Sequence, residues 1–102
     1  MILSVRESSF KPIEVDVKFP FYRYCSLNKY HACYCKFESI NKICKIEENG
    51  NETTVSCYNS NEDVVKLVAT EDMLRGNGGW AIIGEEFFDD AFNRLVKKVG
   101  EI

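Results

Sequence analysis

The last fifth of the chain carries the pattern that most limits the fold. Apolar residues recur there at three- and four-residue spacing, which predicts one wide apolar stripe along a helix. The stripe consists of Phe87, Phe88, Ala91, Phe92, Leu95, Val96 and Val99. Acidic residues crowd the first turns of this helix, and Lys97 and Lys98 lie in its last turn, as the helix dipole favours. Because so amphipathic a helix needs an apolar surface to cover, the rest of the chain must supply one.

Alternating strands supply that surface. Residues 13–21 alternate apolar and polar side chains, which is the period of a half-buried strand, and Pro20 indicates an edge position or a bulge near its end. Three further strands are predicted at residues 30–38, 42–48 and 51–58. A chain of 102 residues is long enough for one core and too short for two. We therefore predict a single α+β domain over residues 1–102, with an antiparallel sheet of about four strands and the C-terminal helix packed on one face.

The turn between the last two strands sets the predicted register. Asn49-Gly50 is the strongest short hairpin pattern, and a two-residue loop there pairs Cys44 with Val55. A loop of even length around residues 39–41 then brings the preceding strand onto the same face. That face carries Cys35, Phe37, Cys44, Ile46, Val55 and Cys57. We expect the C-terminal helix to cover it.

Residues 61–75 suit two different elements. Ser60 and Asp63 resemble a helix capping box, and Gly76 suits the end of a helix. The run of residues 64–68 is also a plausible short strand, so the segment is assigned as a helix with a strand as the alternative. A flexible turn at residues 76–79 and a short apolar lead-in at 80–83 complete the chain before the C-terminal helix.

The lead-in and the start of the C-terminal helix also carry a resemblance. The residues concerned are Trp80, Ile83, Glu85, Glu86, Phe87, Ala91 and Phe92. With a short antiparallel sheet before them, they resemble small proteins of unknown function that bacterial viruses and mobile elements encode. The resemblance implies a phage or mobile-element origin and a non-catalytic role, and it transfers no functional residues.

The cysteines are predicted to pack as free thiols. They are Cys25, Cys33, Cys35, Cys44 and Cys57. Their number is odd and no export signal precedes them, which favours reduced thiols. Structural zinc sites take ligands in pairs separated by two to four residues, whereas one residue separates Cys33 from Cys35 and there is no second pair. We expect no metal and no cofactor.

Candidate catalytic groups are few. The one histidine, His31, shares a strand face with Cys33 but lies two residues from it, and no third group is identifiable to orient the pair. The acidic run at the start of the C-terminal helix would suit a divalent ion, although a solvated helix start that the dipole favours is the preferred explanation. Residues 76–79 lack the Lys-Ser/Thr pair of a phosphate-binding loop. We therefore predict that the protein is not an enzyme.

The distribution of charge and aromatic residues suggests a binding surface. The net charge is −3, which disfavours a general nucleic-acid-coating protein, yet residues 1–46 carry +4 and residues 47–102 carry −7. This asymmetry either marks a polarised surface or is neutralised within the fold. Tyrosines and lysines alternate between residues 18 and 45, on the sheet face opposite the predicted core. The candidate partner-binding residues are Tyr30, Tyr34, Lys36, Ile43, Lys45 and Tyr58.

Three interpretations of that surface stay open. It is a hot spot for a protein partner, a platform that stacks the bases of single-stranded nucleic acid, or a set of cross-strand tyrosine pairs that only stabilise the sheet. The first leads us to expect an accessory, adaptor or inhibitor protein that binds its partner stoichiometrically; a nucleic-acid binder and a virion or assembly component are the alternatives. No apolar run approaches a membrane span and no signal peptide is recognisable, so we expect a cytoplasmic protein without a membrane partner.

Overall fold

The computed structural model describes residues 2–6, 12–61, 65 and 68–100. The elements in these residues are β1 (Ile2–Arg6), β2 (Pro12–Asp16), β3 (Phe21–Asn28), β4 (His31–Ser39), β5 (Lys42–Asn49), β6 (Glu52–Asn59), α2 (Glu71–Arg75), β7 (Trp80–Ile83) and α3 (Glu85–Gly100). None of the described helices is long and apolar enough to cross a membrane.

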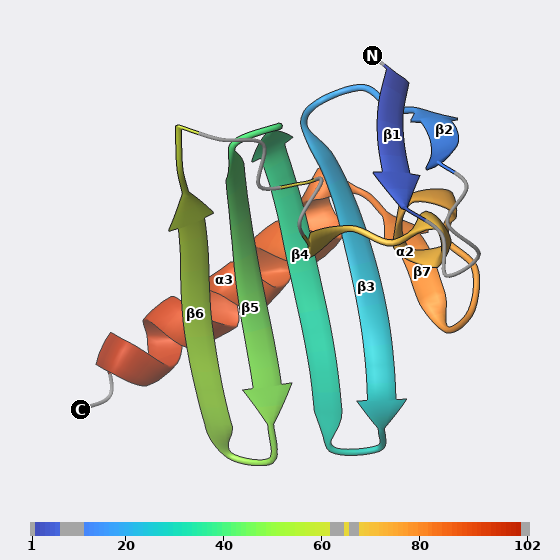
Figure 1. Cartoon of the computed structure of the whole chain (residues 1–102). Coiled ribbons are helices and arrows are strands. Elements are labelled where there is room, and N and C mark those ends of the chain that lie inside the picture. The colour runs from blue at the N-terminus through green and yellow to red at the C-terminus, as the bar shows by residue number, and fades with distance from the viewer. Residues whose placement is uncertain (1, 7–11, 62–64, 66–67, 101–102) are drawn as a thin grey trace.

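The main sheet is antiparallel and has five strands in the order β6-β5-β4-β3-β7, while β1 and β2 form a separate two-stranded ribbon (Figure 1). This confirms the predicted α+β class with a C-terminal helix. Two strands of this sheet were not predicted as such. β7 pairs with β3 and was predicted only as a lead-in to α3, and of β3 only Phe21 belongs to a predicted strand.

The strand predicted over residues 13–21 contains most of β2 and only the first residue of β3, so it is wrong as one continuous strand. β2 ends at Asp16 and pairs with β1, and β3 begins at Phe21 in the main sheet. Pro20 lies between them after a cis peptide bond, and it has no N–H to give to a ladder. The alternation reflects real burial, because Val15 and Val17 are both in the core, but the chain changes sheets between the two halves.

A bulge in β4 overturns the predicted grouping of faces. The pairing of β4 with β5 shifts register between Phe37 and Ser39, so Phe37 lies opposite Ile43 and Lys36 lies opposite Cys44. Because neighbouring residues of a strand point to opposite sides, one extra residue moves the whole of β5 onto the other face relative to β4. The prediction that Cys35 and Phe37 share a face with Cys44 is therefore wrong.

The hairpin between β5 and β6 is displaced by one residue from the predicted turn. Its loop is Gly50-Asn51 rather than Asn49-Gly50, and Gly50 has the positive φ of 62° that such turns require. Cys44 consequently lies opposite Cys57 instead of Val55. The displacement lengthens β5 by one residue and shortens β6 by one, so each residue of β5 exchanges its partner for the one two positions further along β6, and the four apolar residues of the hairpin still share a face as predicted.

The pairings define two faces, and both are covered. The cysteine face carries Arg23, Cys33, Cys35, Phe37, Ile43, Lys45, Glu47 and Tyr58; the tyrosine face carries Tyr22, Tyr24, Tyr34, Lys36, Cys44, Ile46, Val55 and Cys57. The cysteine face packs against Val65, Ala69 and α2, and the tyrosine face packs against Phe88 and Ala91 of α3. Figure 1 shows the two helices on opposite sides of the sheet. The C-terminal helix thus covers Ile46 as predicted, but not Cys35 or Phe37.

The assignment of residues 61–75 is only partly tested. A helix, α2, occupies residues 71–75, with Thr70 as its N-cap and Gly76 in the left-handed conformation at its end, as predicted for that glycine. The predicted capping box includes Asp63, which lies outside the described residues. Arg23 of β3 fixes α2 to the sheet by donating to the carbonyl oxygens of Met73 (2.8 Å) and Leu74 (2.6 Å).

Candidate functional site

The six predicted partner-binding residues do not form one surface. Tyr34 and Lys36 lie on the tyrosine face; Ile43, Lys45 and Tyr58 lie on the cysteine face; Tyr30 is exposed in the turn between β3 and β4. The bulge in β4 is the cause, since it separates residues that a regular ladder would have aligned. Burial also removes two of the six, because Tyr34 is 6% exposed and Ile43 is 2% exposed.

Tyr34 belongs to the contact between α3 and the sheet. Its ring lies 5.7 Å from that of Phe87, and its hydroxyl accepts a hydrogen bond of 3.1 Å from Nη2 of Arg94. Arg94 also contacts Glu48 at 3.1 Å. Burial, together with the hydrogen bond and charge of Glu48, raises the pKa of Tyr34 to about 12. Tyr34 is therefore a core residue rather than a contact for a partner.

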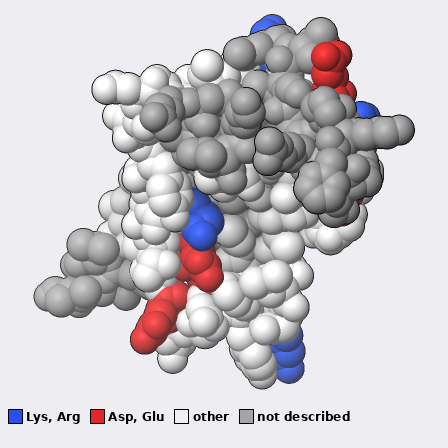
Figure 2. Space-filling view, in the orientation of Figure 1, with Lys and Arg blue, Asp and Glu red and all other residues white. Residues whose placement is uncertain are grey.

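The three predicted residues of the cysteine face line an open pocket there. Its volume is about 340 Å³. The lining residues are Cys33, Cys35, Phe37, Ile43, Lys45, Tyr58, Val68, Met73 and Trp80. Ile43 belongs to its buried apolar wall, whereas Tyr58 is 46% exposed. Figure 2 shows this side of the molecule, where basic and acidic atoms lie side by side in the middle of an otherwise uncharged surface below the grey residues.

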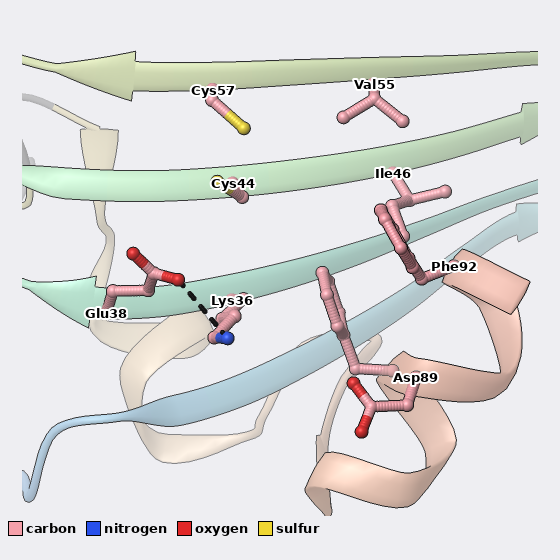
Figure 3. A pocket seen from close by; sticks show the side chains of 9 residues that line it. Lys36, Glu38, Cys44, Ile46, Val55, Cys57, Asp89 and Phe92 are labelled. Atoms are coloured by element: carbon pink, nitrogen blue, oxygen red, sulfur yellow. Dashed lines mark ion pairs between the residues drawn. The ribbon is translucent and has the colours of Figure 1, made fainter. Parts of the chain in front are cut away.

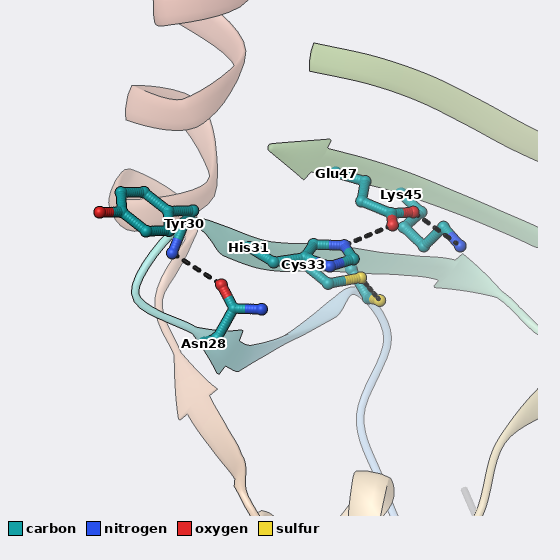
Figure 4. Close-up of polar contacts among 7 residues, drawn as sticks. Asn28, Tyr30, His31, Cys33, Lys45 and Glu47 are labelled. Carbon is teal, nitrogen blue, oxygen red and sulfur yellow. Dashed lines mark hydrogen bonds and ion pairs between the residues drawn. The ribbon is translucent and has the colours of Figure 1, made fainter. Parts of the chain in front are cut away.

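A polar group borders the pocket on β4 and β5. Nε2 of His31 lies 2.5 Å from Oε1 of Glu47, and Nζ of Lys45 lies 3.6 Å from Oε2 of the same carboxylate (Figure 4). The hydrogen bond with His31, with a further contribution from Lys45, lowers the pKa of Glu47. His31 is thus directed at a carboxylate and does not form the Cys–His pair that nucleophilic catalysis requires.

Two thiols lie at the base of this pocket. Sγ of Cys33 is 3.8 Å from Sγ of Cys35. The hydrogen bond from Cys35 and the charge of Lys45 lower the pKa of Cys33, whereas that hydrogen bond and burial raise the pKa of Cys35. Among the described residues, no group of three His, Cys, Asp or Glu side chains is placed to hold a metal ion.

A second, smaller pocket lies between α3 and the outer strands. It measures about 240 Å³, and its lining residues are Lys36, Glu38, Cys44, Ile46, Val55, Cys57, Phe88, Asp89 and Phe92 (Figure 3). Lys36 is engaged there, with Nζ 3.2 Å from Oε1 of Glu38. Cys44 and Cys57 are directly opposite each other, and burial together with Cys57 raises the pKa of Cys44 to about 11. Apolar groups and an internal ion pair thus dominate this pocket.

The sequence patterns missed three of the nine residues that line the cysteine-face pocket. Val68, Met73 and Trp80 come from the chain after β6, and no periodicity relates them to β4 or β5. The sequence patterns also missed Arg23, the buried cation that holds α2 in place. Its position between two aromatic residues, Tyr22 and Tyr24, was the available indication.

Comparison with protein-family models, with curated protein sequences and with solved structures finds no match to this chain. The function is therefore inferred from the geometry of the pocket and its surroundings.

Proposed function

We propose that this protein acts without catalysis, as an accessory, adaptor or inhibitor that binds a protein partner stoichiometrically through the cysteine-face pocket. The observation that carries the proposal is the pocket itself, with buried Ile43 in its wall and exposed Tyr58 and Val68 at its margin. Its volume suits one or two large apolar side chains. Interfaces concentrate their binding energy where such an anchor enters a desolvated pocket surrounded by aromatic residues.

The polar groups at the margin support a protein partner over a small metabolite. Lys45 and His31 both contact the carboxylate of Glu47. Their polar atoms are therefore paired with a residue of the chain itself and are not directed together at a ligand inside the pocket. Small-molecule sites usually direct several polar groups at the ligand. A mixed, internally paired margin around an apolar centre is typical of protein interfaces.

Nucleic acid receives less support from this geometry. A base-stacking platform needs exposed aromatic rings near unpaired cations. Tyr34 is buried beneath α3, Lys36 contacts Glu38, and Lys45 contacts Glu47. The exposed rings of Tyr30 and Tyr58 lie at different ends of the sheet, since one is in the β3–β4 turn and the other is near the end of β6.

The proposal is tested by capture of partners from the source cell with tagged wild-type protein and with Tyr58→Ala combined with Val68→Asp. Both side chains are exposed, so the fold should persist, and we expect the captured protein to be lost. Tyr30→Ala is the matched control, because it removes an exposed tyrosine far from the pocket and should leave capture unchanged. Capture by the double variant at the wild-type level would refute the pocket as the binding site. Steep loss of binding with added salt would instead indicate nucleic acid.

A further inference from the structure

β6 is an edge strand of the described sheet, and its own sequence carries little of the usual protection. It forms eight regular pairs with β5, without a bulge, and among the described residues no strand pairs with its other side. Natural edge strands are commonly protected by lysine, proline, a bulge or short length. β6 has the sequence ETTVSCYN, in which Glu52 at the very start is the sole charged residue. Within the described part of the chain, the outer edge of β6 therefore carries few of the features that usually block the addition of another strand.

α3 extends beyond this edge. The helix starts directly after β7, at the opposite edge of the sheet, and its 16 residues span about 24 Å. Arg94 already reaches Glu48 on β5, and the helix continues to Gly100, about 9 Å further along its axis. The next strand, β6, is only about 4.8 Å beyond β5. Figure 1 accordingly shows the C-terminal turns of α3 passing beyond β6.

The extending part of α3 leaves apolar side chains uncovered. Val96 is 53% exposed, and Phe92 and Val55 are also exposed although they lie on the side of the sheet that α3 covers. Among the stripe residues whose burial is described, Phe88 and Ala91 are buried, and both lie in the first half of the helix. The sheet of one chain is too narrow for the stripe that its own helix carries.

We propose that β6 pairs antiparallel with β6 of a second copy of this chain, around a twofold axis perpendicular to the sheet. Antiparallel pairing of one strand with itself satisfies twofold symmetry, because each copy offers the same surface. The two sheets would become one continuous sheet, with both α3 helices on the same side. The end of each helix would then lie over β6 of the other copy, which supplies the missing surface for Val96 and Phe92.

A second copy fits these features better than an unrelated strand does. A strand edge alone provides less than the roughly 800 Å² per partner of a typical stable interface. The second copy brings both the strand that continues the sheet and a helix that covers the exposed Val55 of the first. The inference goes beyond the proposed function, and it would place two cysteine-face pockets on one side of the dimer, where they can engage a divalent partner with increased avidity.

The test is the oligomeric state of the purified full chain by sedimentation velocity between about 1 and 100 µM, where association depends on concentration. We expect a dimer. Val96→Asp should weaken it by roughly tenfold or more, because a charge would replace an apolar contact at the interface. Ile82→Asp is the matched control, since Ile82 is 66% exposed on β7 at the opposite edge and should leave the dimer intact.

Amide hydrogen exchange provides a second readout that needs no substitution. Protection of the outward amides of β6 should increase with protein concentration, while protection of β4 should not change. A monomer throughout the concentration range would overturn the inference, as would equal weakening by Ile82→Asp and Val96→Asp. The two proposals are told apart by repeating the partner-capture experiment with Val68→Asp alone, because Val68 lies outside β6 and lines the cysteine-face pocket, whereas Val96 lies on α3.

Discussion

At the scale of single residues, Arg23 is the most consequential side chain that the sequence did not identify. It is 6% exposed, donates to the carbonyl oxygens of Tyr22, Met73 and Leu74, and lies 4.8 Å from the centre of the Phe21 ring. Burial lowers its pKa, so the folded protein retains this charge against a desolvation cost. The last carbonyls of a helix have no partner within it, and Arg23 supplies donors to two of them.

Replacing Arg23 with alanine should therefore lower the free energy of unfolding by roughly 3–5 kcal/mol, because buried carbonyls would lose charged donors. Arg23→Lys should recover only part of this loss, since an ammonium group cannot reproduce the planar fork. Urea unfolding followed by circular dichroism measures both. Arg75→Ala, which breaks the exposed pair with Glu71, should cost about 0.5 kcal/mol or less. A cost for Arg23→Ala as small as that of Arg75→Ala would contradict the role assigned to Arg23.

Tyr34 makes the stability dependent on alkaline pH. Its pKa is about 12 in the folded protein and about 10 in an unfolded chain. Because the pKa of Tyr34 is higher in the folded than in the unfolded protein, its contribution to the free energy of unfolding is complete below pH 10 and is lost as the pH rises towards 12. We expect the urea midpoint of the wild type to fall across this window and that of Tyr34→Phe to fall less steeply. Parallel curves for the two proteins would show that the phenol is not held neutral by the fold.

At the scale of elements, α3 was predicted correctly in position and incorrectly in the surface that it covers. Phe88 is buried against the ring of Tyr22, with centroids 5.6 Å apart. Phe88→Ala should cost about 3–5 kcal/mol, because it leaves a cavity between helix and sheet. Leu95 is only partly buried, so Leu95→Ala should lower the free energy of unfolding by less than Phe88→Ala does.

Phe87→Ala is the matched control for Phe88→Ala. Phe87 is the same residue type one position away, but it is exposed and loses mainly ring contacts with Tyr24 and Tyr34, worth about 0.5–1.5 kcal/mol each. Thermal melting of the two variants should place Phe88→Ala clearly lower. The reverse order would mean that the helix is rotated about its axis relative to the structure described above.

The limits of prediction for the strands have a definite physical origin. Alternation fixes which residues of one strand share a face, and that was correct within each of β4, β5 and β6. Which faces of two neighbouring strands coincide depends on the residues that join the strands. A bulge of the kind found between Phe37 and Ser39 shifts this register, and no particular residue type is required for it. Its effect reached the candidate site, because it separated Tyr34 and Lys36 from Ile43, Lys45 and Tyr58.

At the scale of the whole molecule, the sheet separates two cores. Phe37 and Ile43 belong to the cluster on the cysteine face, and Tyr34 and Ile46 belong to the cluster under α3. The sequence of β4 already indicated this arrangement, because Ala, Cys, Tyr and Phe fill both sides of the strand and few charges alternate with them. Interpreting Tyr34 as exposed hid that pattern, since a tyrosine suits a buried position as well as a surface one when its hydroxyl finds a partner.

The two cores on this sheet should unfold in a single transition. Small substitutions in one core should nevertheless change the free energy of unfolding independently of substitutions in the other. Ile43→Val and Ile46→Val each remove one methylene group from β5, one from each core, and each should cost about 0.5–1.5 kcal/mol. The side chains point to opposite faces and share no cluster, so the double variant should show the sum of the two costs within about 0.5 kcal/mol. Urea unfolding at a fixed, dilute protein concentration should give a single transition with an unchanged slope for all four proteins. Two separated transitions in either single variant would show that the cores form independently, and a large deviation from additivity would show that they communicate through the backbone of β5.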